Sequence, residues 1–289
     1  MNRRFLFVII IFFLFGFTVG VKKIFPYETI MSSYHIVKAR MAQQVTGNKD
    51  FSNCTIDEIK NVPDGATAFI GHAYGSSSKN NFIAKNVSNF IEKNSHLLSS
   101  IVFTGDVFAV PSSEKWLRLA ELGADLNIYI APGNHDVMRA DSREVFQRSV
   151  YGKMKYPSII NTSLGKVILE DSTSTKWAVS SETVNMLNVN KSDIKIVARH
   201  NMPIKELLEF ANSPAGLGEE IDTLSSLKGK LSSGKIIWII GDSGVSLQFP
   251  RLKCLTSENH MFVINGIGEI PGDTVLLSDE GNLYSYIIK

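Results

Sequence analysis

The run Ile101-Val102-Phe103-Thr104-Gly105-Asp106 indicates the class of fold, because a short apolar segment rich in β-formers ends there in glycine and a carboxylate. Runs of the same kind recur at 67–71, 127–131, 194–198 and 235–240. Helical patterns separate these runs, at roughly 81–97, 114–125, 142–149 and 203–212. Strands that alternate with helices indicate an α/β architecture built on a buried sheet.

The end of the chain follows a different pattern. Strand-like runs at 261–265, 274–277 and 283–288 are separated by Gly-Asp and Glu-Gly turn signals, and the sequence between them has no helical periodicity. We therefore expect a second, partly antiparallel sheet.

Composition excludes several classes of protein. The chain has 289 residues, long enough for a hydrophobic core that needs no disulfides or metal ions to stabilise it. Its 30 basic and 28 acidic residues give a net charge of +2. Basic residues form no run longer than a pair, which argues against nucleic-acid binding. Two cysteines, Cys54 and Cys254, are too few for a disulfide framework or a cysteine-based metal site. A single disulfide and two buried thiols both remain open.

The N-terminal sequence predicts a membrane-targeting segment. Residues 5–21 contain no charge, and Arg3-Arg4 and Lys22-Lys23 flank them. A helix of this length spans roughly 25 Å, and snorkelling lysines extend its reach toward the ~30 Å hydrocarbon core. The apolar run is longer than an ordinary signal-peptide core, and Thr18 and Gly20 make a poor cleavage site.

These features favour an uncleaved single-pass anchor over residues 1–25, with a cleaved signal peptide as the alternative. Residues 26–61 are polar and mixed, and the apolar spacing between Pro26 and Gln44 predicts a stalk or docking helix. We expect the short arginine-bearing end in the cytoplasm and the domain at 62–289 outside it.

Polar side chains follow all five strands of the α/β region. The carboxyl ends of such strands are where ligand sites gather, and Asp, Asn and His are donors suited to divalent cations. The residues at these positions are His72, Asp106, Asn134, His135, His200 and Asp242.

The order of these motifs resembles the calcineurin-like metallophosphoesterases, over about residues 66–289. The shared motifs are Gly-Asp at 105–106, Gly-Asn-His-Asp at 133–136, His200 after a strand and a late glycine-led block at 241–244. The segment Leu169-Glu170-Asp171-Ser172, with Trp177 and a helical stretch from Glu182 to Leu187, looks like the link between the family's third and fourth motifs. The resemblance implies a two-sheet α/β/β/α sandwich with helices on both outer faces.

The resemblance also implies roles for particular residues. In that family two divalent cations share a bridging aspartate and activate the water that attacks phosphorus. By position, Asp106 would bridge the cations, and Asn134 and His200 would bind the second of them. His135 would be the general acid that protonates the leaving oxygen, a role suited to imidazole. A mixed nitrogen and oxygen ligand set suits Mn, Fe or Zn.

Two motifs depart from the family pattern. The family's first motif is Asp-x-His, and this chain has His72-Ala73-Tyr74; its last motif is Gly-His-x-His, and this chain has Gly241-Asp242-Ser243-Gly244. One carboxylate is lost and Asp242 is gained, so the site keeps two. We expect the second cation position, with Asp106, Asn134, His200 and Asp242, to be tightly occupied.

The first cation position keeps Asp106 and His72 but loses its other usual ligands, so we expect it to be weak, altered or empty. Glu269 follows a strand, where it serves either as a replacement ligand or as an ordinary turn residue.

The sequence therefore predicts a membrane-anchored, metal-dependent phosphoesterase that acts on a phosphomonoester or phosphodiester. The alternative is a catalytically weak or inactive member that binds a partner in an envelope or polysaccharide assembly. Gly241-Asp242-Ser243 also matches the nucleophile block of Gly-Asp-Ser esterases. Those enzymes carry the block early and a partner Asp-x-x-His late, and this chain has the reverse order and no such partner.

Overall fold

The chain divides into two compact units, Met1–Thr46 and Gly47–Lys289, in the computed structural model. The structure describes residues 50–75, 81–138, 140–189, 194–210, 221–231, 234–242, 252–269 and 272–289, all of them in the second unit. The first unit, with the predicted anchor at 1–25, lies outside these residues. Within the described ranges, no helix is long and apolar enough to cross a membrane.

One sheet has six strands and contains the strands predicted at 67–71, 101–104 and 127–131. Its order is β2-β13-β12-β3-β4-β5. The three predicted strands are parallel to one another, and β12 runs antiparallel to β3. The strands are β2 (Asp57–Glu58), β3 (Ala66–Ile70), β4 (Leu98–Phe103), β5 (Asn127–Ile130), β12 (Thr274–Asp279) and β13 (Asn282–Ile287).

The other sheet has seven strands in the order β1-β10-β11-β9-β8-β7-β6. Strands β7, β8, β9 and β11 are parallel, and antiparallel strands flank them on both sides. The strands are β1 (Ser52–Asn53), β6 (Ser158–Thr162), β7 (Gly165–Leu169), β8 (Ile194–Arg199), β9 (Lys235–Ile240), β10 (Leu252–Ser257) and β11 (His260–Asn265).

The second sheet exists, but its membership differs from the expectation. Of the three tail strands, only β11 belongs to the seven-stranded sheet, where it pairs with β9. Strands β12 and β13 form a hairpin on the six-stranded sheet instead. Both β11 and β12 are buried along nearly their whole length, because each lies inside a sheet covered on both faces.

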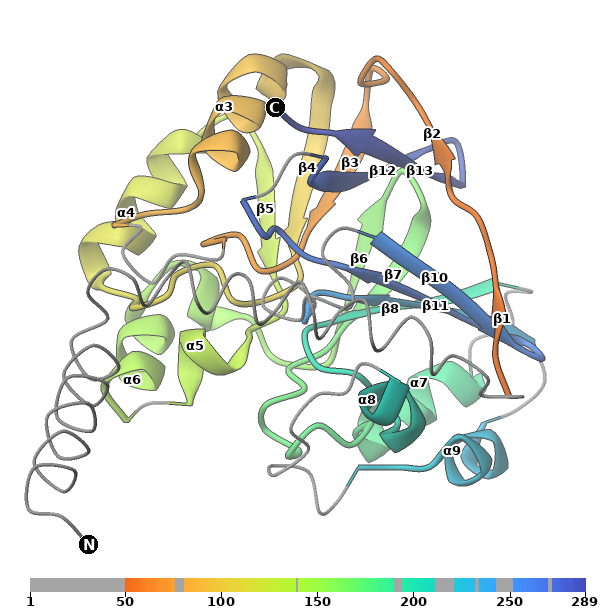
Figure 1. The fold of residues 1–289 in the computed structure, drawn as a ribbon. Coiled ribbons are helices and arrows are strands. Elements are labelled where there is room, and N and C mark those ends of the chain that lie inside the picture. Colours follow the sequence, from red (N-terminus) through yellow and green to blue (C-terminus); the bar gives the residue numbers. More distant parts are fainter. Residues whose placement is uncertain are drawn as a thin grey trace, which may run out of the picture. The chain divides into compact units, whose positions relative to one another are not determined.

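Helices cover both outer faces, on opposite sides of the two sheets (Figure 1). Helices α3, α4 and α6 correspond to the patterns predicted at 81–97, 114–125 and 142–149, and α8 to that at 203–212. The described helices are α3 (Lys85–Asn94), α4 (Ser113–Leu122), α5 (Asn134–Val137), α6 (Ala140–Arg148), α7 (Ser181–Val189), α8 (Lys205–Phe210) and α9 (Leu224–Lys230), with short 3-10 turns η1 (Ser95–Leu97) and η2 (Tyr151–Lys153).

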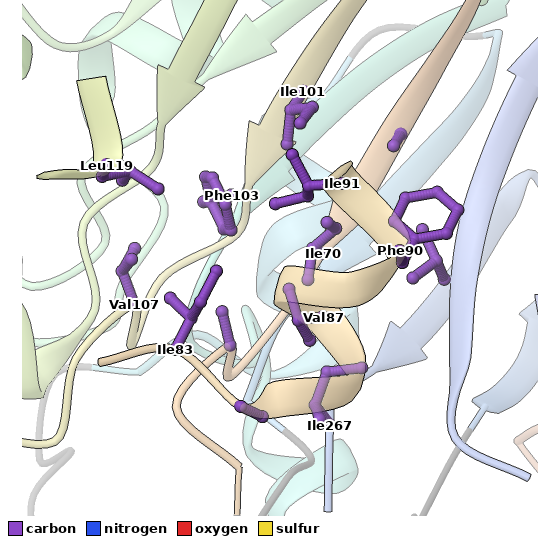
Figure 2. Close-up of a cluster of buried hydrophobic side chains, with 14 of the residues drawn as sticks. Ile70, Ile83, Val87, Phe90, Ile91, Ile101, Phe103, Val107, Leu119 and Ile267 are labelled. Atoms are coloured by element: carbon purple, nitrogen blue, oxygen red, sulfur yellow. The ribbon is translucent and has the colours of Figure 1, made fainter. Parts of the chain in front are cut away.

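Three hydrophobic clusters define the layers. The first joins α3 and α4 to the six-stranded sheet, and Figure 2 shows Val87 and Ile91 of α3 beside Ile70 and Ile101. The second joins α7, α8 and α9 to the seven-stranded sheet. The third lies between the sheets and contains side chains of both. The fold is therefore a mixed α/β sandwich with two sheets inside and helices outside.

Alternation along single strands explains why these sequences are apolar throughout. In β9, Trp238 and its neighbours at 236 and 240 face the helices, whereas Ile237 and Ile239 face the other sheet. Successive side chains of a strand point to opposite faces, so a strand buried on both faces must be apolar at every position.

The domain begins earlier than the predicted boundary at residue 62. Residues 50–61, assigned from the sequence to a stalk, contain β1 and β2, which pair with β10 and β13. Cys54 and Cys254 form a disulfide, and the Cys54 N–H donates to the Cys254 carbonyl at 3.1 Å. Of the two possibilities left open for the cysteines, the structure has the disulfide, which ties the start of the domain to β10.

A buried histidine makes the core sensitive to acid. Trp238 Nε1 donates a hydrogen bond to His260 Nδ1 at 3.1 Å, and the two rings stack at 6.3 Å. An indole N–H only donates, so Nδ1 must accept and the imidazole is neutral. Burial above all, and then Lys228, lowers the pKa of His260 from 6.5 to about 4.

We expect acid to destabilise the wild-type protein more than His260→Gln. Because the folded pKa lies below the unfolded one, stabilisation that is present above pH 6.5 is lost as the pH falls toward 4. The variant should lose about 2 kcal/mol less free energy of unfolding than wild type over this range. Denaturant unfolding at both ends of the range measures the difference, with the exposed His96→Gln as control. Equal losses in wild type and His260→Gln would contradict the assignment.

Candidate metal centre

The carboxyl ends of strands from both sheets meet at one place, and glycines allow the close approach. A Cβ on Gly241, after β9, would lie 1.8 Å from the carbonyl oxygen of Thr104, after β4. A Cβ on Gly105 would lie 2.5 Å from the His200 ring, and one on Gly133 would lie 2.3 Å from Asp106 Oδ1. The loops that carry the predicted ligands therefore pack with no room for a side chain between them.

The side-chain oxygens of Asp106 and Asn134 both lie close to Nε2 of His200. The distances from Nε2 are 3.2 Å to Asn134 Oδ1 and 3.4 Å to Asp106 Oδ1. Asp242 Oδ1 lies further out, at 3.9 Å. Asp106 and His200 are buried, whereas the Asp242 side chain is 31% exposed. The four residues predicted to hold the second cation therefore lie together, although their sequence positions span 136 residues between Asp106 and Asp242.

The tautomer of His200 follows from its other ring nitrogen. Nδ1 lies 2.9 Å from the Thr104 carbonyl oxygen, which can only accept, so Nδ1 carries a proton. Nε2 is thereby left to face the three oxygens. In metal sites, a backbone carbonyl commonly holds the far nitrogen of a ligating histidine in this way and orients its ring.

The charges of the site are strongly coupled. Burial alone would lower the pKa of His200, but attraction to Asp106 and Asp242 outweighs burial and raises it to about 10. Burial alone would raise the pKa of Asp106, but His200 and His72 hold it below its usual value. Burial raises the pKa of Asp242, and His200 opposes that shift. Without a cation, the His200 imidazolium is thus the positive charge that balances the carboxylates.

The donor set fits a divalent cation at this position. One N–H cannot satisfy three oxygen acceptors, whereas ligand atoms about 2.1 Å from a shared ion stand about 3.0–3.4 Å from one another. The two shorter distances already lie in this range. Within the described ranges, no group of three or more His, Cys, Asp or Glu side chains is placed so that it could hold a metal ion. Asn134 supplies an amide oxygen, and Asp242 Oδ1 lies just outside this range, at 3.9 Å from Nε2.

His135 lies beside these ligands without being one of them. Its main-chain N–H donates to Asp106 Oδ1 at 2.9 Å. Its Nδ1 lies 3.0 Å from the Ala109 carbonyl oxygen and therefore carries a proton, which leaves Nε2 facing the Tyr74 hydroxyl at 3.5 Å. The ring is held at one nitrogen and offers the other to a ligand at the site.

Aromatic rings lie where the first cation position was expected. His72 Nε2 is 3.8 Å from Asp106 Oδ2, and the His72 and Tyr74 rings are 4.1 Å apart. Burial, despite the nearby Asp106, lowers the pKa of His72 to about 4, so its ring is neutral. Gly244 lies outside the described residues. Glu269 lies against Gly75, where an added Cβ would meet its Cγ at 2.5 Å.

Two loops carry their site residues in unusual backbone conformations. His72 and Asp106 both have positive φ angles, 51° and 54°. Side chains other than glycine rarely adopt such angles, and they persist where surrounding contacts impose them. The His72 N–H donates to the Gly105 carbonyl at 3.0 Å, which ties the two loops together.

Asp136, the last residue of the Gly-Asn-His-Asp motif, has a structural role. The sequence alone did not distinguish it from the neighbouring residues of the motif that face the site. Asp136 is fully buried, and its carboxylate accepts hydrogen bonds from the main-chain N–H groups of Gly133 and Val107 at 3.0 and 3.1 Å. Burial, followed by Asp106, raises its pKa to about 7. It thus joins the loop after β4 to the loop after β5.

Sequence reasoning assigned no site role to the side chains that lie behind Asp242. Asn201 Nδ2 donates to Asp242 Oδ2 at 3.3 Å, and Ser172 contacts Asn201. Arg199 and Glu170 form a buried ion pair at 2.7 Å beneath them. The signal available in the sequence was a polar residue, Asn201, directly after the predicted ligand His200.

No family model matches the chain, and no curated protein matches it either.

Replacing a glycine at the strand ends should disrupt the centre. Gly241→Ala places a Cβ 1.8 Å from a backbone oxygen, so the free energy of unfolding should fall by about 3 kcal/mol. Gly229→Ala is the matched control, because a Cβ there meets nothing within 4 Å and α9 favours alanine. Denaturant unfolding measures both. Equal stability of the two variants would show that the loops are not packed this closely.

Proposed function

We propose that this chain is a membrane-anchored, metal-dependent phosphoesterase that resembles the calcineurin-like metallophosphoesterases and acts outside the cytoplasm. The observation that carries the proposal is the convergence of Asp106, Asn134 and His200, from three separate strand ends, on one point beside His135. The two-sheet sandwich with helices on both outer faces is consistent with that family's fold.

A divalent cation such as Mn, Fe or Zn, when bound, would lower the pKa of a water molecule and offset the negative charge of a phosphoryl group. Asp106 and Asp242 supply the two negative charges that attract it, and Asn134 adds a neutral oxygen. His200 offers Nε2 because Thr104 holds Nδ1. His135, as the imidazolium, donates the Nε2 proton to the leaving oxygen as the phosphorus–oxygen bond breaks, since hydrogen bonds at Nδ1 and at the main-chain N–H fix its position.

The centre is proposed to hold one tightly bound cation. His72 and Tyr74 stand in the first position, and the un-ionised phenol of Tyr74 is a poor ligand beside the imidazole of His72, so a second cation would be held weakly. The same observation favours the alternative function, a catalytically weak member that binds a phosphorylated or glycan partner in an envelope assembly.

The proposed location rests on two features. The uncharged run at 5–21 is typical of a membrane anchor. The Cys54–Cys254 disulfide favours an oxidising compartment, because thiols in the cytosol are kept reduced.

Metal analysis of the purified protein should find one tightly held divalent cation per chain. Asp106→Asn and His200→Ala should reduce the bound metal to a small fraction, since the first removes the negative charge of a central ligand and the second removes a ligand altogether. His96→Ala, which changes an exposed histidine, should leave the content unchanged. Elemental analysis after dialysis measures the content, and two tightly held ions per chain would contradict a single position.

Hydrolysis of p-nitrophenyl phosphate and its bis ester, with Mn²⁺, Zn²⁺ or Fe²⁺ added, tests the activity. With metal still bound, His135→Ala should lower kcat at least about 100-fold on an alkyl phosphate, whose leaving oxygen needs the proton of the general acid, and less on p-nitrophenyl phosphate. Asp106→Asn should lower both kcat and metal content, and His96→Ala should change neither. Metal-bound wild type without hydrolysis would favour the binding function. Hydrolysis that survives both substitutions would remove the phosphoesterase assignment.

A further inference from the structure

Asn201 is a buried polar residue whose side chain is hydrogen-bonded to Asp242. It follows His200 directly and is fully buried. Its Nδ2 donates to Asp242 Oδ2 at 3.3 Å, while Asp242 Oδ1 is the oxygen 3.9 Å from His200 Nε2. One oxygen of the carboxylate is therefore engaged from behind, and the other faces the centre.

The orientation of the Asn201 amide follows from its neighbour. The Asn201 main-chain N–H donates to Ser172 Oγ at 3.1 Å, so Oγ already accepts one hydrogen bond. The hydroxyl proton of Ser172 is directed at Asn201 Oδ1, at 3.0 Å. With Oδ1 held by Ser172, the NH₂ group must face Asp242. The reverse orientation would set an amide oxygen against a carboxylate oxygen.

A buried ion pair holds the main chain at the same point. Arg199 Nε donates to the Asn201 carbonyl at 2.8 Å, and Arg199 Nη1 donates to Glu170 Oε2 at 2.7 Å. Glu170 Oε1 in turn accepts from the Ser180 N–H at 2.9 Å. Arg199, Glu170 and Ser172 are all buried, so the support behind Asn201 has little freedom to move.

We propose that Asn201 is a positioning residue that sets the geometry of Asp242 as a cation ligand. Its NH₂ group holds Oδ2, which leaves Oδ1 as the oxygen of Asp242 that would face the cation, and Ser172 holds Asn201 in the orientation this requires. The inference rests on the proposed function, since it assigns Asp242 to the metal centre. Asn201 touches neither substrate nor cation.

A double-mutant cycle on cation affinity tests this role. The dissociation constant for Mn²⁺ is measured by calorimetry on the full chain, as wild type, Asn201→Ala, Asp242→Ala and the double variant. Asn201→Ala should weaken binding about tenfold when Asp242 is present, the lower end of the effect seen when a residue that orients a metal ligand is removed. It should cause no further loss once Asp242 is removed, because the two residues act as a unit.

Control variants separate positioning from general damage. Asn188→Ala removes another asparagine hydrogen bond, from α7 to the Lys230 carbonyl, and should leave the Mn²⁺ affinity unchanged. Ser172→Ala keeps both Asn201 and Asp242 and should give a smaller loss of affinity in the same direction. It decides the question if Asn201→Ala fails to fold or if Asp242→Ala binds too weakly to measure. Thermal unfolding of every variant reports on folding.

The outcomes distinguish this inference from the proposed function. Equal losses on Asn201→Ala with and without Asp242, or no loss at all, overturn the role of Asn201 and leave the metal centre in place. An Asp242→Ala variant with wild-type affinity overturns it as well. Wild-type protein that binds no Mn²⁺, Zn²⁺ or Fe²⁺ removes the metal centre itself, and the inference with it.

Discussion

The close packing of strand ends from the two sheets is the constraint that makes the centre possible. Gly241 meets Thr104, and Gly105 meets His200, at distances that leave no space for a Cβ. Each contact joins a loop of the six-stranded sheet to one of the seven-stranded sheet. Only when these backbones touch do side chains from separate sheets come within 3.2–3.4 Å of one another. Glycine is therefore needed at these positions because it has no side chain to keep the backbones apart.

The centre brings more negative charge together than a buried site tolerates without a counter-charge. Asp106, Asp136 and Asp242 lie near one another, and their pKa values respond differently. Asp106 stays ionised beside His200, whereas burial and Asp106 raise the pKa of Asp136 to about 7. Neighbouring carboxyl groups whose pKa values are shifted in opposite directions are typical of functional sites. Asp136 holds the loops, and Asp106 faces the ligands.

Much of the fold was predictable because it rests on local patterns. The strands after which the site residues come were all placed within a few residues, since short apolar runs rich in β-formers are a strong signal. Strands β6, β7 and β10 were not predicted. Ser158–Thr162 and Leu252–Ser257 mix polar and apolar residues, because both belong to the antiparallel margins of their sheet. The two-residue strands β1 and β2 are too short for any periodicity, so the domain boundary was placed too late.

Local sequence patterns were enough to specify the alternation of strands and helices, the uncharged N-terminal run and the identity of the donor residues at the strand ends. These features depend on neighbouring residues alone. The division of the tail strands between two sheets, the pairing of Cys54 with Cys254 and the place of Asn201 behind Asp242 became known from the folded chain. Each of these joins residues far apart in the sequence, and their meeting depends on strand order and register, which no local pattern encodes.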